Sequence, residues 1–150
     1  MVSRSASLPD FVPELRQYLL EYPEKDLHSA DSFFYWEKVN FGMKPTVRVN
    51  HGVVYRVGGA TGASAVAIKQ LYASHYFHTA LDVSVCVRDV GAQPRGYYLV
   101  TLKSSQQDGL TGAKGSAVRK VVVDKTRSSL EKALASIKST VEGGATVARQ

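Results

Sequence analysis

The histidines of this 150-residue chain are its most obvious candidates for metal chemistry. His75 and His78 lie three residues apart, a spacing that places two side chains on one face of a helix but on opposite faces of a strand. The residues around them predict a strand, and Asp82 is the only acidic residue close to them in sequence. We therefore expect no metal site and no cofactor.

Other sequence motifs with known chemistry are missing. The chain has no Gly-x-Ser-x-Gly nucleophile motif. Its glycine-rich segments, residues 58–62 and 109–116, match neither the dinucleotide-binding nor the P-loop pattern and predict turns. The single cysteine, Cys86, excludes an intramolecular disulfide and a cysteine-based zinc site, and we expect it to pack within a strand. We therefore assign no catalytic residue from the sequence.

A set of aromatic and imidazole side chains is the better candidate for ligand binding. The set falls on otherwise apolar faces of predicted strands and consists of His51, Tyr55, Tyr72, Tyr76 and Tyr98. Pockets for apolar ligands combine hydrophobic and aromatic walls with a few polar groups. An ordinary packed core contains the same residue types, and His51 within a row of valines is also typical of a hydrogen-bonded core histidine. Both interpretations stay open.

Hydrophobic periodicity predicts the elements that hold these side chains. Residues 8–22 predict a short helix that Pro23 ends. Residues 32–41 carry aromatic side chains on both alternating faces, which predicts either a strand buried on both sides or a packed extended segment. Residues 46–57 alternate with period two, which predicts a half-buried strand with His51 on its apolar face.

Three further runs predict the rest of the sheet. Residues 65–78 are too long for one regular strand, so we expect a bend or bulge near Ser74 and His75. Residues 81–88 alternate cleanly and predict another half-buried strand. Residues 97–103 predict the last strand, with three side chains facing inward: Tyr98, Val100 and Leu102.

A long amphipathic helix is predicted from Lys114 to Glu142, because apolar residues recur there at three- and four-residue steps until Gly143 and Gly144. About 28 helical residues span roughly 42 Å, against about 33 Å for a ten-residue strand, so the helix can lie across the whole sheet. The predicted fold class is α+β: a bent antiparallel sheet of about five strands packed against this C-terminal helix, with a short N-terminal helix.

Composition indicates one globular domain, residues 1–150, with an ordered core from about residue 8 to residue 142 and flexible ends. The chain is 44% hydrophobic and 21% charged. No apolar run approaches the roughly 20 residues of a membrane helix, and the first residues do not resemble a signal peptide. The sequence as written predicts a cytoplasmic protein, and a leader upstream of Met1 would make it an exported one.

The net charge of +6 is concentrated in the predicted C-terminal helix. Between Lys114 and Glu142, seven basic side chains stand against three acidic ones, a net charge of +4. A basic helix face attracts anionic membranes or nucleic acid. The simpler interpretation is that these charges form the solvated side of an amphipathic helix. The candidate anion-binding residues are Lys114, Arg119, Lys120 and Arg127.

Two motifs resemble a group of uncharacterised bacterial proteins: FFYWEKVNFGMKP at residues 33–45 and KQLYASHYFHTAL at residues 69–81. The resemblance covers roughly residues 32–142, includes DGL at residues 108–110 and Arg119, and implies no known activity. Members of that group tend to have more chain in front, often with an export leader. At the level of fold, a sheet followed by a long helix resembles START-like helix-grip domains, which typically hold lipids, sterols or other apolar molecules between the sheet and the helix.

These observations lead to three functional hypotheses. The first is non-enzymatic binding of an apolar or amphipathic, lipid-like small molecule between the sheet and the C-terminal helix. The second is an interaction module that applies the basic helix to an anionic membrane surface, with nucleic acid ranked below a membrane as its partner. The third is a cyclase- or hydrolase-type enzyme that uses His75, His78 or Asp82, and it ranks last because the two histidines diverge on a strand.

Overall fold

The computed structural model describes residues 12–40, 44–56, 63–89, 91, 96–107 and 112–147. The chain separates into two compact units, residues 1–108 and 109–150, and each is described by itself. In its described part, the first unit contains helix α2 and five strands, and the second contains helix α3. The predicted α+β class is confirmed, with a short N-terminal helix, a five-stranded antiparallel sheet and a long C-terminal helix.

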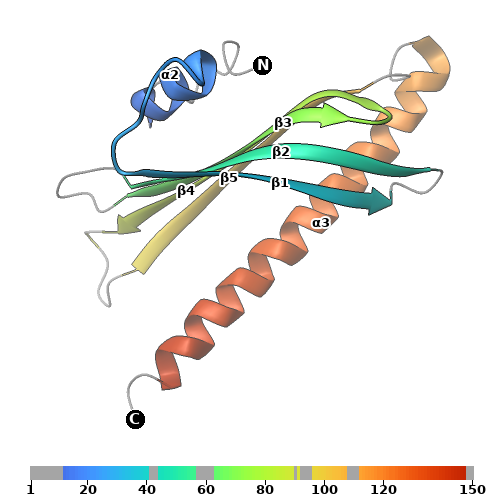
Figure 1. Ribbon diagram of the computed structural model, residues 1–150. Coiled ribbons are helices and arrows are strands. Elements are labelled where there is room, and N and C mark those ends of the chain that lie inside the picture. Colours follow the sequence, from blue (N-terminus) through green and yellow to red (C-terminus); the bar gives the residue numbers. More distant parts are fainter. Residues whose placement is uncertain are drawn as a thin grey trace. The chain divides into compact units, whose positions relative to one another are not determined.

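The five described strands form one antiparallel sheet in chain order, with β1 and β5 at its two edges (Figure 1). Every ladder therefore joins strands that are neighbours in sequence, which is the simplest topology for an antiparallel sheet. The strands are β1 (Ala30–Asn40), β2 (Pro45–Arg56), β3 (Ser64–Ala73), β4 (Phe77–Asp89) and β5 (Gly96–Gln107).

Alternation along these strands gives the sheet two different faces. The face that packs against helix α2, which we call the α2 face, buries the core side chains Val53, Tyr55, Ala65, Ala67, Leu81 and Val83. The other face, which we call the opposite face, carries the residues that alternate with them. The cross-strand register places one row of residues on this opposite face: Phe33, Gly52, Ile68, Asp82 and Lys103.

Helix α2 (Pro13–Glu21) completes the core of this unit. Proline is well tolerated at the start of a helix, because the amide that it lacks would have no partner there. Leu15, Tyr18 and Leu19 then follow at three- and four-residue steps, and all three are buried against the α2 face. Figure 1 shows helix α2 on one side of the sheet. The predicted helix over residues 8–22 is confirmed for its described part.

Two polar contacts hold α2 on the sheet. Lys69 on β3 donates from Nζ to the carbonyl oxygen of Leu19 at 2.8 Å, which places a cation at the carboxyl end of the helix. Tyr55 on β2 donates its hydroxyl hydrogen to the carboxylate of Glu14 in the first turn of the helix. Each end of α2 is therefore tied to a different strand.

The prediction of one long run over residues 65–78 is wrong, because the chain reverses within it. Strand β3 ends at Ala73 and β4 begins at Phe77, with Tyr76 between them at a φ of 67°. The bend that we expected near Ser74 and His75 is a full turn. The pairing of β3 with β2 also shifts at Val49 and Asn50, so a bulge lies in the same part of the sheet.

The prediction that residues 32–41 form a strand buried on both sides is also wrong. Strand β1 is an edge strand, and Trp36 is 70% exposed.

The prediction that three β5 side chains face inward is wrong as well, because Tyr98, Val100 and Leu102 are exposed. These side chains are on the α2 face of the sheet. The buried strand residues of the core beneath α2 come from β2, β3 and β4.

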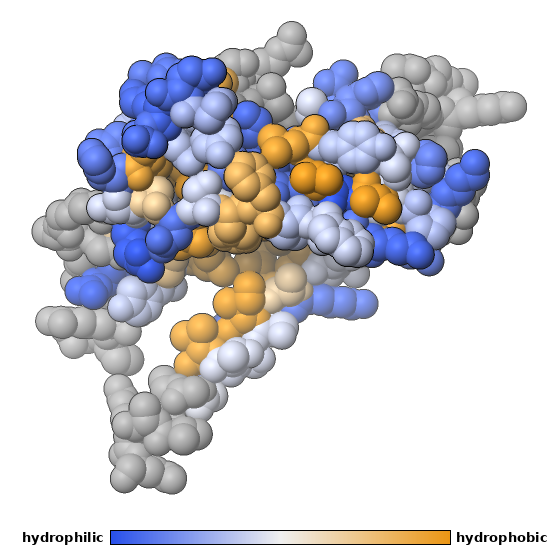
Figure 2. All heavy atoms as spheres, viewed as in Figure 1, coloured by the Kyte–Doolittle hydropathy of each residue, from blue (hydrophilic) through white to orange (hydrophobic). Residues whose placement is uncertain are grey.

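Helix α3 (Gly112–Val147) is longer than predicted and continues through Gly143 and Gly144. Apolar side chains along it, including Val123 and Val141, are exposed, and Figure 2 shows hydrophobic residues on one side of the helix. Among the described residues, no helix combines the length and the apolar composition needed to cross a lipid bilayer.

Candidate functional site

Two of the predicted ligand-binding residues, His51 and Tyr55, belong to the core beneath α2. The His51 ring is fully buried, stacks on Phe34 with ring centroids 4.8 Å apart, and lies 4.4 Å from the ring of Tyr22. Its Nε2 lies 2.7 Å from the hydroxyl oxygen of Ser32. In this position His51 packs against aromatic rings and has a hydrogen-bonding partner, as a core histidine does.

Burial lowers the pKa of His51, and the nearby Lys69 ammonium lowers it further. Both effects disfavour the charged ring, so His51 is neutral in the folded protein near neutral pH. Its Nδ1 has no hydrogen-bond partner among the residues that the structure describes. A positive charge on this ring would be buried between aromatic side chains.

The other three predicted ligand residues lie outside this core. Tyr72 is on β3 and 56% exposed, and Tyr98 is on β5 and 63% exposed. Tyr76 is half-buried in the turn between β3 and β4. The five residues named from the sequence therefore occupy four different places in the sheet unit: the core beneath α2, strand β3, strand β5 and the turn between β3 and β4.

The residues of the enzyme hypothesis do not form a cluster. Within the described part of the chain, no group of three or more His, Cys, Asp and Glu side chains could hold a metal ion. His75 is exposed in the turn before β4, and His78 is exposed at the start of that strand. Asp82 forms an ion pair with Lys103, and Cys86 is a half-buried strand residue, as expected.

The anion-binding candidates divide in a similar way. Lys114 and Arg119 have side chains outside the described residues, whereas Lys120 and Arg127 are exposed on α3. Arg127 donates from Nε to Glu131 at 2.9 Å, one turn further along the helix. The use of this helix on an anionic membrane stays a prediction.

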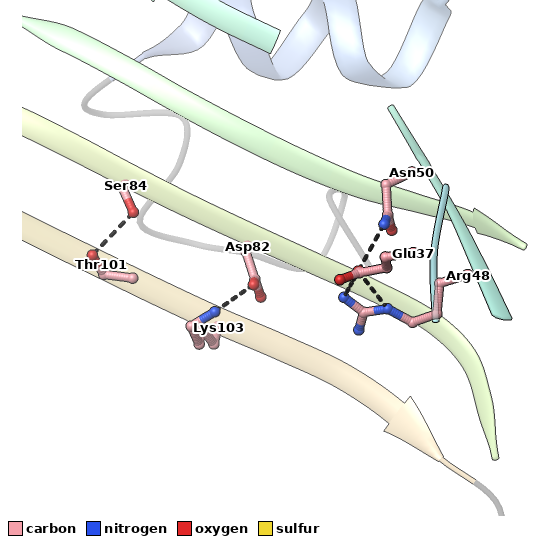
Figure 3. A network of polar contacts seen from close by, with 7 residues as sticks. All are labelled: Glu37, Arg48, Asn50, Asp82, Ser84, Thr101 and Lys103. Carbon is pink, nitrogen blue, oxygen red and sulfur yellow. Dashed lines mark hydrogen bonds and ion pairs between the residues drawn. The ribbon is translucent and has the colours of Figure 1, made fainter. Parts of the chain in front are cut away.

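A network of polar side chains lies on the opposite face, at the end where β1 meets β2. Glu37 on β1 accepts a hydrogen bond from Arg48 Nε at 3.0 Å and another from Asn50 Nδ2 at 2.9 Å (Figure 3). Arg48 is directly opposite Glu37 in the ladder, and Asn50 is two residues further along β2. The same carboxylate oxygen thus joins a cation and an amide from the neighbouring strand.

Two further cross-strand pairs continue the network towards the β5 edge. Asp82 on β4 pairs with Lys103 on β5, with 2.5 Å between oxygen and nitrogen, and the hydroxyls of Ser84 and Thr101 lie 3.0 Å apart (Figure 3). In each pair, the two residues are directly opposite each other in the antiparallel register. Neighbouring side chains on one sheet face are the geometry that favours such contacts.

Tyr35 belongs to the same network and keeps its proton. Burial raises the pKa of its phenol most, and the negative charges of Glu37 and, to a lesser extent, Asp82 raise it further, while the charge of Arg48 and a hydrogen bond with Asn50 lower it. The phenol is therefore a neutral hydrogen-bonding group near neutral pH.

Two buried amides form the centre of the site. Asn50 is 1% exposed and Gln70 is 7% exposed, and the two residues are directly opposite each other on β2 and β3. Asn50 Oδ1, Gln70 Oε1 and Gln70 Nε2 have no hydrogen-bond partner among the described residues. Buried polar atoms in proteins are almost always hydrogen-bonded, so such a pair needs an explanation. We call these two residues, with Tyr35, Glu37 and Arg48, the amide site.

An apolar patch adjoins the amide site on the same face. The ring of Phe33 lies over Gly52, so closely that a Cβ at that position would be 2.5 Å from Phe33 Cζ. The ring of Tyr35 follows, with its centroid 6.0 Å from that of Phe33. The register brings three aliphatic side chains to this part of the opposite face, which with Phe33 form the apolar patch: Val54, Val66 and Ile68.

The sequence did not identify the amide site, because its members come from three strands. Strand alternation places Arg48 and Asn50 on the polar side of β2, but it says nothing of which residues face them on β1 and β3. Gln70 is opposite Asn50 in the regular β2–β3 register that begins at Arg56 and Ser64, and the shift affects only the pairs beyond it, from Val49 onward. The pattern within a single strand does not specify this register.

No protein-family model, no curated protein and no solved structure matches this chain. The resemblance to a bacterial protein group and the START-like resemblance therefore stay predictions.

Proposed function

We propose that this protein binds a small amphipathic molecule, without catalysis, on the opposite face of the sheet. The polar part of the molecule binds at the amide site, and its apolar part covers the apolar patch. This retains the class of function expected from the sequence but assigns it to different residues.

The observation that carries the proposal is the pair of buried amides, Asn50 and Gln70, with three unpartnered polar atoms. An unsatisfied buried donor or acceptor costs about 1–3 kcal/mol, and the cost disappears when a ligand supplies the missing hydrogen bond. The two amides adjoin each other across the sheet, so one polar group can reach both.

The apolar patch supports an amphipathic ligand rather than a purely polar one. Phe33 is 46% exposed and Val66 is 37% exposed, whereas aliphatic residues in a completed core are buried. Burying apolar surface stabilises a complex by about 25 cal/mol per Å². A molecule that covers both the amides and the patch gains from hydrogen bonds and from apolar burial together.

Displacement of an apolar fluorescent dye, N-phenyl-1-naphthylamine, by short amphiphiles tests the proposal. A matched pair of valines provides the control, because Val66 on the opposite face is 37% exposed and Val47 on the α2 face is 38% exposed. We expect Val66→Lys to weaken amphiphile binding at least about tenfold, because the ligand would cover a charge. Val47→Lys should leave binding unchanged.

Equal effects of the two substitutions, or an absence of amphiphile binding to the wild-type protein, would contradict the proposal. Native mass spectrometry of the purified protein provides a second, independent readout. A co-purified amphiphile that is lost in Val66→Lys and retained in Val47→Lys would support the assigned face.

A further inference from the structure

We propose that the polar group recognised at the amide site is uncharged and carries a hydrogen-bond donor beside an acceptor, as a carboxamide does. This inference rests on the proposed function and names the class of its ligand. It follows from which donors and acceptors of the amide site already have a hydrogen-bond partner within the protein.

Some donors and acceptors of the amide site have a hydrogen-bond partner and others have none in the described structure. Asn50 Nδ2 donates to Glu37, which leaves Asn50 Oδ1 as a free acceptor. Gln70 offers both an acceptor, Oε1, and a donor, Nε2, without a partner in the described structure. Because both Oε1 and Nε2 of Gln70 are unpartnered, exchanging the two atoms would still leave one donor and one acceptor unsatisfied. The ligand must therefore donate and accept at neighbouring atoms.

The charged side chains around the amides argue against a charged ligand. Glu37 is occupied by Arg48 and Asn50, and Asp82 is occupied by Lys103. A carboxylate would have to displace Glu37 from Arg48, and an ammonium group would have to displace Arg48 from Glu37. Removing one partner of a partly buried ion pair leaves the other uncompensated. A neutral amide leaves both ion pairs intact.

Three probes with the same alkyl chain separate the possibilities: octanamide, octanoate and octylamine. Their dissociation constants for the 150-residue protein are measured by dye displacement and by titration of the ¹⁵N-labelled protein. We expect octanamide to bind at least about tenfold more tightly than the two charged probes. The side-chain NH₂ resonances of Gln70 should shift with octanamide and not with octanoate.

Gln70→Met tests the residue, because methionine keeps the length and removes both polar atoms. It should reduce the preference for octanamide to within about twofold of the charged probes, while the alkyl chain still binds. Gln106→Met is the matched control, since Gln106 is exposed on the α2 face of β5. That variant should keep the full preference for the amide.

The outcomes distinguish the two proposals. If all three probes bind equally, or a charged probe binds best, the ligand class is wrong while amphiphile binding stands. If Gln70→Met keeps the preference, or the Gln70 resonances do not respond, the assignment to this side chain is wrong. If no probe binds, the proposed function and the ligand class both fail.

Discussion

Replacing Gly52 with alanine tests the position of the Phe33 ring, which forms the largest part of the apolar patch. An alanine Cβ would lie 2.5 Å from Cζ and 2.6 Å from Cε2 of Phe33, well inside contact distance. The obstacle is the far end of one side chain, so the ring can move while the strand stays in place. We expect Gly52→Ala to displace the ring from β2.

The expected change in stability has two terms of opposite sign. Alanine within a strand is favoured over glycine by about 0.5–1 kcal/mol, because glycine loses more chain entropy on folding. Forcing the ring away from its preferred rotamer costs about 0.5–1.5 kcal/mol, and lost burial of part of the ring costs roughly 1 kcal/mol. Gly52→Ala should therefore destabilise the protein by about 1 kcal/mol. In a Phe33→Ala background, the same substitution should instead stabilise it by about 0.5–1 kcal/mol.

Urea unfolding followed by circular dichroism, applied to the four proteins of this double-mutant cycle, measures both terms. The sign change of Gly52→Ala between the two backgrounds is the diagnostic result. Gly96→Ala is the control, because a Cβ there meets no atom within 4 Å, and its effect should not depend on Phe33. A Gly52→Ala protein at least as stable as the wild type would refute the reasoning.

Two further predictions concern charge. Because burial and Lys69 lower the pKa of His51, its contribution to stability is complete above the unfolded pKa of about 6.5 and is lost as pH falls below it, by at most about 1.4 kcal/mol per pH unit. Urea unfolding between neutral and mildly acidic pH should show this loss in the wild type and a weaker dependence in His51→Phe, and parallel curves would contradict it. Glu37→Gln keeps the shape of its side chain but removes its charge from Arg48, so it should cost about 1 kcal/mol at low salt and less at high salt. Equal losses at both salt concentrations would show that the charge is not responsible.

The sequence predicted those parts of the fold that depend on local pattern. Period-two alternation over residues 46–57 placed His51 on the apolar face of a strand, and that strand is β2 with His51 in the core. Such alternation is local, because it states which side chains share a face. It does not state which strand ends at an edge or how far a helix extends over the sheet. For this reason, Trp36 and Tyr98 were expected to be buried and are exposed.

The candidate site could not be predicted because it depends on register. Glu37 and Arg48 meet only through the pairing of β1 with β2, and Asn50 meets Gln70 only through the pairing of β2 with β3. Single-sequence patterns contain no information on these alignments unless turn chemistry determines them. The tyrosines were conspicuous because they interrupt apolar rows, whereas the amides looked like ordinary polar residues of a half-buried strand.

The buried, unpartnered hydroxyl of Thr46 provides a comparison for the amide site. It tests whether every unsatisfied polar atom on this face affects ligand binding, or only those of the amide site. Thr46 alternates with Arg48 and Asn50 on the opposite face, is fully buried, and its Oγ1 has no partner among the described residues. Both Thr46→Val and Gln70→Met remove unsatisfied polar atoms, so each should raise the free energy of unfolding, by about 1 kcal/mol in the case of Thr46→Val. Only Gln70→Met should also change which amphiphile is preferred. If Thr46→Val altered the preference equally, unsatisfied polar atoms on this face would not mark the ligand position. If Gln70→Met destabilised the protein, the Gln70 amide would have a structural partner, and its unpartnered atoms would no longer indicate a ligand at the amide site.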